Sequence, residues 1–242
     1  MTLDLLKGEH LTNRLAGKVA IVTGSGRGIG RSMSILMAKE GARVVVVDPG
    51  VSLSGDKDQS RPADDVVAEI KSFGGIAVPC YESVGSFESA EKIVATALEN
   101  FDTVDILATC HGILRDRMIY NMSEEEWDAV IQVHLKGTFS LIQSTSKIMR
   151  KNKYGRIIAI TSTSGLYGNA GQANYGAAKD GIVGLVRVAA KDLGRSDVCV
   201  NAIAPSADTR MTEGITEEAK QKMKAMGLGT PDVLFGDGPL EM

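Results

Sequence analysis

The sequence predicts a single α/β domain, a doubly wound parallel sheet covered by helices on both faces. From residue 17 onward, short apolar runs rich in β-branched residues alternate with helix-length amphipathic segments, the order that builds parallel sheets. The apolar runs are continuous rather than alternating, which indicates strands buried on both faces. With 242 residues and 43% hydrophobic content, the chain can bury one large core. We expect this domain over residues 16–242, after an N-terminal extension over residues 1–15.

The predicted strands are short apolar stretches such as "KVAIVTG" and "ARVVVVD", whose β-branched residues suit a pleated, buried surface. The continuous run "GRIIAITS" is of the same kind. In chain order the strands are predicted at residues 18–24, 42–48, 76–81, 104–110, 155–162 and 198–205. These apolar runs are too short to be membrane-spanning segments, which need roughly 20 apolar residues.

The predicted helices lie between these strands and repeat their apolar residues at helical spacing. Gly41 ends the first of them, as glycine commonly does after the last helical residue. In chain order the helices are predicted at residues 30–41, 63–74, 86–101, 123–152 and 174–194. The stretch at 123–152 is long enough for one long helix or for a pair of helices.

Charge and cysteine content narrow the class of protein. A net charge of −3 offers no broad basic surface for nucleic acid or an anionic membrane. The three cysteines form no CxxC pair, which favours a reducing compartment and argues against a disulfide framework and against a zinc site. The first 15 residues contain acids and no long apolar core, so they do not resemble a secretory signal. We expect a soluble cytoplasmic protein with no metal site.

A glycine-rich loop, "TGSGRGIG" at residues 23–30, joins the first strand to the first helix. Glycines let the backbone turn tightly and approach a phosphate closely, and the helix N-terminus offers amide groups and a partial positive charge to a pyrophosphate. In this strand–loop–helix context the loop predicts dinucleotide binding, and with it a Rossmann fold. The residues expected to bind the cofactor here are Gly24, Ser25, Arg27, Gly28, Ile29 and Gly30.

Asp48, at the end of the second strand, predicts which dinucleotide is bound. A carboxylate there accepts hydrogen bonds from the ribose hydroxyls of NAD and repels a 2′-phosphate. It could also be a plain turn acid before Pro49. Arg27 argues the other way, because a basic residue in the loop could hold the 2′-phosphate of NADP. The carboxylate lies where that phosphate would go, so we expect NAD.

The stretch "NYGAAKDG" places Tyr175 four positions before Lys179 in a predicted helix. Residues at this spacing share a helix face, so the pair is either an ordinary solvated surface or a proton-transfer device. A tyrosine has an unperturbed pKa of about 10, which a nearby cation lowers by favouring the phenolate. Ser162 follows the fifth strand, at the sheet edge where ligands bind in such folds.

Together, "TGSGRGIG", Ser162 and "NYGAAK" resemble the short-chain dehydrogenase/reductase family, and the resemblance covers roughly residues 15–212. Within the family, "GILRDRMIYNMSEEEWDAVIQVHLKGTF" and "YGRIIAITSTSGLYGNAGQANYGAAK" resemble the (3R)-hydroxyacyl-CoA dehydrogenase part of peroxisomal multifunctional enzyme type 2. The family resemblance implies a catalytic role for the Tyr175–Lys179 pair.

The resemblance also implies a mechanism and further site residues. Tyr175 would take the proton of a substrate hydroxyl, Lys179 would lower the pKa of Tyr175 and bind the nicotinamide ribose, and Ser162 would hold the substrate oxygen. These three residues and His134 form the expected catalytic set. Besides the glycine loop, Asp48, Tyr175 and Lys179, the residues implied to line the cofactor are Ser83, Val84, Cys110, Gly112, Pro205, Ala207 and Thr209.

Two histidines depart from the family pattern. The family usually has Asn-Asn-Ala-Gly after the fourth strand, where this chain has "TCHG", so His111 replaces a small residue. His111 could belong to a proton relay or only fill space. His134 stands where the family has a helix asparagine, and it could hold a water that links Lys179 to solvent or be purely structural. Cys110 is expected to be a buried small apolar residue rather than a reactive thiol.

The expected function is NAD-dependent oxidation of a secondary alcohol, most simply a 3-hydroxyacyl-CoA-type substrate. The altered "TCHG" leaves a second hypothesis open, a non-catalytic cofactor-holding subunit that supports a paralogous subunit in a hetero-oligomer. An NADP-linked reductase is supported by Arg27 alone. The helices at residues 123–150 and 175–193 resemble those through which family members assemble, so we expect a homodimer or homotetramer.

The C-terminal part predicts an incomplete sheet. Family members have a substrate-covering helix, which "MTEGITEEAKQKMKAM" resembles, followed by another helix and a final strand. Residues after this segment contain no β-branched strand run, only a tail rich in glycine and proline. We therefore expect the final strand to be absent, which would leave the edge of the sixth strand uncovered or filled by another chain.

Overall fold

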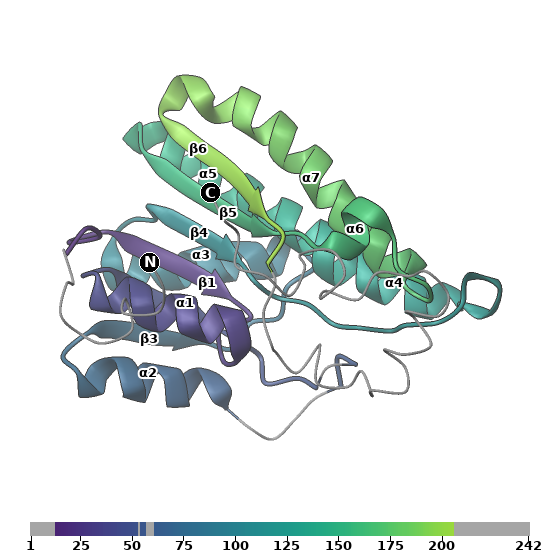
Figure 1. Cartoon of the computed structure of the whole chain (residues 1–242). Coiled ribbons are helices and arrows are strands. Elements are labelled where there is room, and N and C mark those ends of the chain that lie inside the picture. Colours follow the sequence, from purple (N-terminus) through teal and green to yellow (C-terminus); the bar gives the residue numbers. More distant parts are fainter. Residues whose placement is uncertain (1–12, 53, 57–60, 206–242) are drawn as a thin grey trace, which may run out of the picture.

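The computed structural model describes residues 13–52, 54–56 and 61–205 (Figure 1). Its centre is a six-stranded parallel sheet in the order β3-β2-β1-β4-β5-β6. The strands are β1 (Val19–Thr23), β2 (Arg43–Val47), β3 (Ile76–Cys80), β4 (Ile106–Thr109), β5 (Gly155–Ile160) and β6 (Val198–Ile203). The strand order reverses between β1 and β4, as in doubly wound folds that bind dinucleotides.

Helices cover both faces of this sheet (Figure 1). They are α1 (Gly28–Lys39), α2 (Pro62–Ser72), α3 (Phe87–Phe101), α4 (Glu124–Ile131), α5 (Gly137–Asn152), α6 (Thr163–Tyr167) and α7 (Ala173–Leu193). Buried residues of α1 and α2 pack with one side of the central strands, and those of α3, α5 and α7 pack with the other. The predicted fold class, a doubly wound parallel sheet, is confirmed.

The strands form where the sequence has continuous apolar runs because both of their faces are covered. All five residues of β1 are buried, as expected for the centre of a two-sided core. The turn into β4 is fixed by the buried carboxylate of Asp105, which accepts a 2.9 Å hydrogen bond from the Val19 amide. This bond joins the amino ends of β1 and β4, the two strands at the reversal point.

The stretch at residues 123–152, predicted as one long helix or a pair, is a pair of helices. The two are joined by a π-helical turn, η3 (Gln132–Lys136). The first of the pair, α4, begins with a capping box in which the Ser123 hydroxyl accepts from the Glu126 amide and the Glu126 carboxylate accepts from the Ser123 amide. This reciprocal pair satisfies two amides at the helix start. The turns η2 (Ile119–Asn121) and η4 (Gly194–Ser196) and the short helix α6 were not predicted from the sequence.

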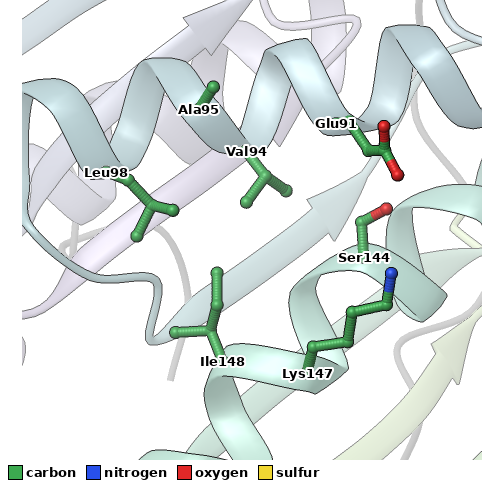
Figure 2. Close-up of a pocket in the computed structure, with 7 residues that line it drawn as sticks. All are labelled: Glu91, Val94, Ala95, Leu98, Ser144, Lys147 and Ile148. Carbon is green, nitrogen blue, oxygen red and sulfur yellow. The ribbon is translucent and has the colours of Figure 1, made fainter.

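A shallow apolar pocket lies between α3 and α5 (Figure 2). Val94 and Leu98 of α3 face Ile148 of α5, and Glu91 and Lys147 lie at its polar end (Figure 2). None of its lining residues is a predicted site residue, so this pocket is not the expected active site.

Several sequence predictions fall at the ends of the chain. Residues 1–12, most of the predicted extension, lie outside the described residues, and so does everything after Pro205. The expectations about the substrate-covering helix and the final strand therefore stay predictions, as do the domain boundaries. Within the described residues β6 is one of the two edge strands of the sheet, and β3 is the other. No helix in that part of the chain is long and apolar enough to cross a membrane.

Leu107, in the centre of the sheet on β4, is fully buried and provides a test of this core. Leu107→Ala should lower the free energy of unfolding by about 2–5 kcal/mol, because it removes apolar contacts and leaves a cavity. Chemical denaturation followed by circular dichroism measures the change. Leu36→Ala on α1, where the side chain is 48% exposed, is the control and should cost much less. Equal losses for the two variants would contradict the described core.

Candidate active site

The predicted site residues gather at the carboxyl ends of β1, β4 and β5, where the strand order reverses. The glycine loop follows β1, the "TCHG" segment follows β4, and Ser162 follows β5. A crevice at such a reversal point is where open α/β sheets bind their ligands. The topology therefore brings together most of the side chains that the sequence predicted separately.

The glycine loop packs so closely against its surroundings that no side chain fits at Gly24 or Gly30. Gly24 has a φ of +63°, and a Cβ added to it would lie 2.6 Å from the His111 Cα. A Cβ on Gly30, at the start of α1, would overlap the Gly24 carbonyl oxygen. Arg27 places no side-chain hydrogen bond on the first amides of α1. A cradle bounded by backbone and a helix N-terminus fits the pyrophosphate of a dinucleotide.

Asp48 is bound to the glycine loop. Its Oδ2 accepts a hydrogen bond from the Gly26 amide and its Oδ1 accepts one from the Gly50 amide, both at 2.9 Å. The turn-acid interpretation is thus partly right, since the carboxylate binds the turn after β2 as well as the glycine loop after β1. The same bonds hold its negative charge at the loop. Ser25 is turned inward, and its hydroxyl donates to the Val22 carbonyl at 2.7 Å.

Ser162 and Tyr175 are close neighbours. Ser162 is the N-cap of α6, where its hydroxyl accepts from the Ser164 amide at 3.2 Å. Tyr175 lies in the first turn of α7. Burial raises the pKa of Tyr175, and interaction with the Ser162 side chain opposes this rise. Asn174 fixes this turn, because its side-chain amide donates to the carbonyls of Arg115 and Glu126 at 2.9 Å.

The net pKa of Tyr175 is raised, contrary to the expectation that Lys179 would lower it. Burial of the phenol is the largest cause, the Ser162 bond opposes it, and the negative charge of Asp116 adds to the rise. Lys179 does not counter this, since its Nζ lies 5.6 Å from the centroid of the Tyr175 ring and donates to the Ile160 carbonyl at 2.7 Å. The ammonium group is thus held beside the ring by β5.

Lys179 is a buried amine, with its residue only 3% exposed. Burial lowers the pKa of Lys179 to about 8, and charge interaction with Cys110 opposes the shift slightly. A lysine in this range still carries its charge at neutral pH but titrates far more readily than an exposed one. The hydroxyl of Thr161 also donates to the Lys179 carbonyl at 2.6 Å, so the end of β5 and the residue after it hold Lys179 by side chain and backbone.

His134 lies in the π-helical turn η3 and is buried. Its Nε2 lies 2.8 Å from the Ile113 carbonyl oxygen and 3.1 Å from the Ile113 amide nitrogen, and its ring packs edge-on against Tyr175 with centroids 5.1 Å apart. Burial, followed by the charge of Lys179, holds the pKa of His134 well below its usual value. These contacts support the structural interpretation, and a role in holding water stays a prediction.

His111 is buried just after β4, and Cys110 beside it is half-buried. The His111 Nδ1 lies 2.6 Å from the Thr23 hydroxyl, and burial, with the charge of Lys179, lowers the pKa of His111 to about 3. The ring is therefore neutral at physiological pH. Burial raises the pKa of the Cys110 thiol to about 12, which agrees with the expectation of an unreactive cysteine.

Of the other predicted cofactor residues, those that the structure describes follow strands of the sheet. Ser83 and Val84 follow β3, Gly112 follows β4 and Pro205 follows β6, whereas Ala207 and Thr209 lie outside the described residues. No group of three or more His, Cys, Asp or Glu side chains suited to a metal occurs in the described part of the chain.

Two residues near Tyr175, Asp116 and its partner Gln172, were not predicted from the sequence. The Gln172 amide donates to the Asp116 carboxylate at 2.8 Å, and the adjacent backbones of Arg117 and Gly171 are joined by a 2.8 Å hydrogen bond. Burial raises the pKa of Asp116. Only the fold brings these two loops together, so no spacing in the sequence could have indicated the pair.

Comparisons with known proteins agree with this geometry. The family model described as short chain dehydrogenase matches residues 18–220. A peroxisomal multifunctional enzyme type 2 from Drosophila melanogaster is 46% identical over 224 residues, which are 93% of this chain and 35% of that protein. A 3-oxoacyl-(acyl-carrier-protein) reductase from Synechocystis is 41% identical over 205 residues, 84% of this chain and 80% of that protein.

A solved structure is similar as well. The crystal structure of a short chain dehydrogenase from Mycobacterium avium is 48% identical, with a TM-score of 0.75 over 80% of this chain and 71% of that one. The chain spans only about a third of the length of the Drosophila protein, so the similarity concerns that third alone. The match to the family model includes all six strands described above. The chain belongs to the short-chain dehydrogenase/reductase family and is an oxidoreductase.

Proposed function

We propose that the protein interconverts a secondary alcohol and a ketone with NAD, acting on a 3-hydroxyacyl-CoA-type substrate. The observation that carries the proposal is the convergence of Ser162, Tyr175 and Lys179 beside the glycine loop. A phenol, a hydroxyl and a buried ammonium group are the parts needed to move the proton of an alcohol. When bound, the nicotinamide supplies the other half of the chemistry, by accepting or donating a hydride.

The protein's own residues would handle the substrate oxygen and its proton. Ser162 would donate a hydrogen bond to that oxygen and hold it next to the Tyr175 phenol. During oxidation Tyr175, as phenolate, would take the hydroxyl proton, and during reduction the phenol would return one to the ketone oxygen. Because the pKa of Tyr175 is raised in the described structure, the positive charge of Lys179 would have to act on the phenol more directly during turnover.

Asp48 supports NAD over NADP. Its carboxylate is fixed at the glycine loop by two backbone amides, and a fixed negative charge at the end of β2 opposes a 2′-phosphate. Some carboxylate lone pairs are left for ribose hydroxyls, since each oxygen can accept more than one hydrogen bond. The family match alone supports a nicotinamide cofactor without choosing between the two.

The acyl substrate rests on similarity in sequence. The segments around His134 and Tyr175 resemble (3R)-hydroxyacyl-CoA dehydrogenases, and the Synechocystis relative is named for a 3-oxoacyl substrate on a carrier protein. Both activities concern oxygen at the third carbon of an acyl thioester. Turnover should therefore be measured as NAD reduction with 3-hydroxyacyl-CoAs, plain alcohols and hydroxysteroids. Binding of NADH without turnover of any of them would favour the alternative, a non-catalytic cofactor-holding subunit.

Assembly into a homodimer or homotetramer is part of the proposal. Phe139 on α5 is 42% exposed and Val188 on α7 is 58% exposed, so both helices carry apolar side chains that a second copy could cover. A paralogous subunit could cover them too. A cytoplasmic location stays a prediction, and the word peroxisomal in the Drosophila relative's name is a statement about that protein.

Tyr175→Phe should abolish turnover and leave NADH affinity nearly unchanged, because the ring still packs while no phenolic oxygen remains to exchange a proton. We expect kcat to fall well below a tenth of the wild-type value, a loss exceeding about 1.4 kcal/mol in the barrier. Tyr154→Phe, just before β5 at the opposite end of the sheet, is the control and should keep full activity. Retention of more than about a tenth of kcat by Tyr175→Phe would show that Tyr175 is not the acid/base.

Asp48→Asn should shift cofactor preference from NAD towards NADP by about tenfold or more, about 1.4 kcal/mol, since it removes the negative charge. The side-chain oxygen of asparagine can still accept one of the two amide bonds, so the glycine loop keeps part of its support. Asp65→Asn on the exterior of α2 controls for a general loss of charge. Dissociation constants for NADH and NADPH from fluorescence titrations give the ratio. An unchanged ratio would mean that Asp48 only orders the turn.

A further inference from the structure

His111 is a buried titratable group that the proposed mechanism does not use. Its side chain is in the "TCHG" segment after β4, and the residue is 7% exposed. The ring lies between the end of β1 and the start of α5. Such a neutral polar group in the interior normally persists because it forms specific hydrogen bonds.

One side of the imidazole is bound to β1. The Nδ1 lies 2.6 Å from the Oγ1 of Thr23, and the same hydroxyl lies 3.4 Å from the Ala108 carbonyl oxygen. Because the contact with Nδ1 is the shorter of the two, we assign the threonine hydroxyl as donor to Nδ1. A neutral imidazole can accept a hydrogen bond at that nitrogen. Burial keeps the ring neutral by lowering the pKa of His111 to about 3. The bond therefore persists throughout the physiological pH range.

The bond is formed at the residue that begins the glycine loop. Thr23 is the last residue of β1, and Gly24 follows it. The Gly24 Cα packs against the His111 backbone so closely that an added Cβ would lie 2.6 Å from the His111 Cα and 2.9 Å from the Cys110 carbonyl carbon. Gly30 in turn packs against Gly24. A shift of Thr23 away from His111 would therefore displace the backbone that faces the phosphate cradle.

The other side of the imidazole faces the start of α5. A Cβ on Gly137 would lie 3.1 Å from the His111 Nε2 and 3.3 Å from the Gly85 nitrogen, so the ring fills the space that this glycine leaves. A backbone interaction with Val133 slightly opposes the lowering of the His111 pKa, but Nε2 has no hydrogen bond of good geometry within the described residues. The imidazole is thus held at its Nδ1 side by a hydrogen bond and elsewhere by packing and by this weaker backbone interaction.

We propose that His111 is a positioning residue of the dinucleotide site, which fixes Thr23 and thereby the glycine loop in the conformation that receives the pyrophosphate. This inference rests on the proposed use of a nicotinamide dinucleotide. It goes beyond the alternatives of a proton relay and a space-filler, because it assigns the imidazole a specific hydrogen bond with an effect on cofactor affinity. His111 touches neither substrate nor reacting atoms in this role.

The test uses the pair Thr23→Val and Thr23→Ser in the full-length protein. Valine has nearly the shape of threonine but lacks the hydroxyl, and serine keeps it. We expect Thr23→Val to raise the dissociation constant of NADH about tenfold, the size expected for one buried hydrogen bond, and Thr23→Ser to stay close to wild type. His111→Ala should weaken NADH binding similarly, and the Thr23→Val/His111→Ala double variant should lose little more, because both changes remove the same bond.

Thr145→Val is the matched control. Thr145 is buried on α5, and its hydroxyl donates within its own helix to the Leu141 carbonyl at 2.8 Å. It should change thermal stability without changing NADH affinity. The kcat of Thr23→Val at saturating NAD should stay within about twofold of wild type, since a defect in positioning acts on binding rather than on the chemical step.

The outcomes are distinguishable. Unchanged NADH affinity in Thr23→Val, or an equal loss in Thr23→Ser, would overturn the inference and leave the proposed function intact. Fully additive losses in the double variant would also overturn it. A wild-type protein that binds neither NADH nor NADPH would overturn the proposed function and this inference with it. If His111→Ala fails to fold, the two Thr23 variants still decide the matter.

Discussion

A buried ammonium group is the constraint around which the site is arranged. Lys179 reaches the Ile160 carbonyl at 2.7 Å inside the protein, where burying an unpaired charge costs several kcal/mol. Burial, with a further contribution from this charge, lowers the pKa of both neighbouring histidines, His111 and His134, which therefore remain neutral and serve as hydrogen-bonding and packing groups. Because Thr161, just after β5, also donates to the Lys179 carbonyl, the backbone of α7 at this position is fixed to the same end of the strand as the charge.

Close backbone contacts shape the rest of the site. The glycine loop approaches the end of β4 so tightly that no side chain fits between them, and the Asp48 carboxylate binds the same loop from β2. On the other side, the π-helical turn brings His134 against Tyr175. A π-turn inserted into a helix is often found at a functional site. Here it lies between α4 and α5, beside Tyr175.

The sequence predicted what depends on local pattern. Continuous apolar runs predicted all six described strands, and the glycine loop, Ser162, Tyr175 and Lys179 were each recognisable from their neighbours in the chain. What the sequence did not predict depends on tertiary contacts. The raised pKa of Tyr175 comes from its burial and from Asp116 on another loop, and the Thr23–His111 bond joins the last residue of β1 to the segment after β4. The π-turn has no residue signature that separates it from the helices beside it.

The most direct test of this account is the titration of Lys179 itself. In protein with 13C-labelled lysine, the Cε resonance that disappears in Lys179→Met should titrate near pH 8, as the pKa of about 8 for this buried amine requires. The other lysines should titrate near their usual pKa of about 10.4. A Lys179 resonance that titrates with the exposed lysines would show that the amine is solvated, and would contradict a site organised around a buried charge.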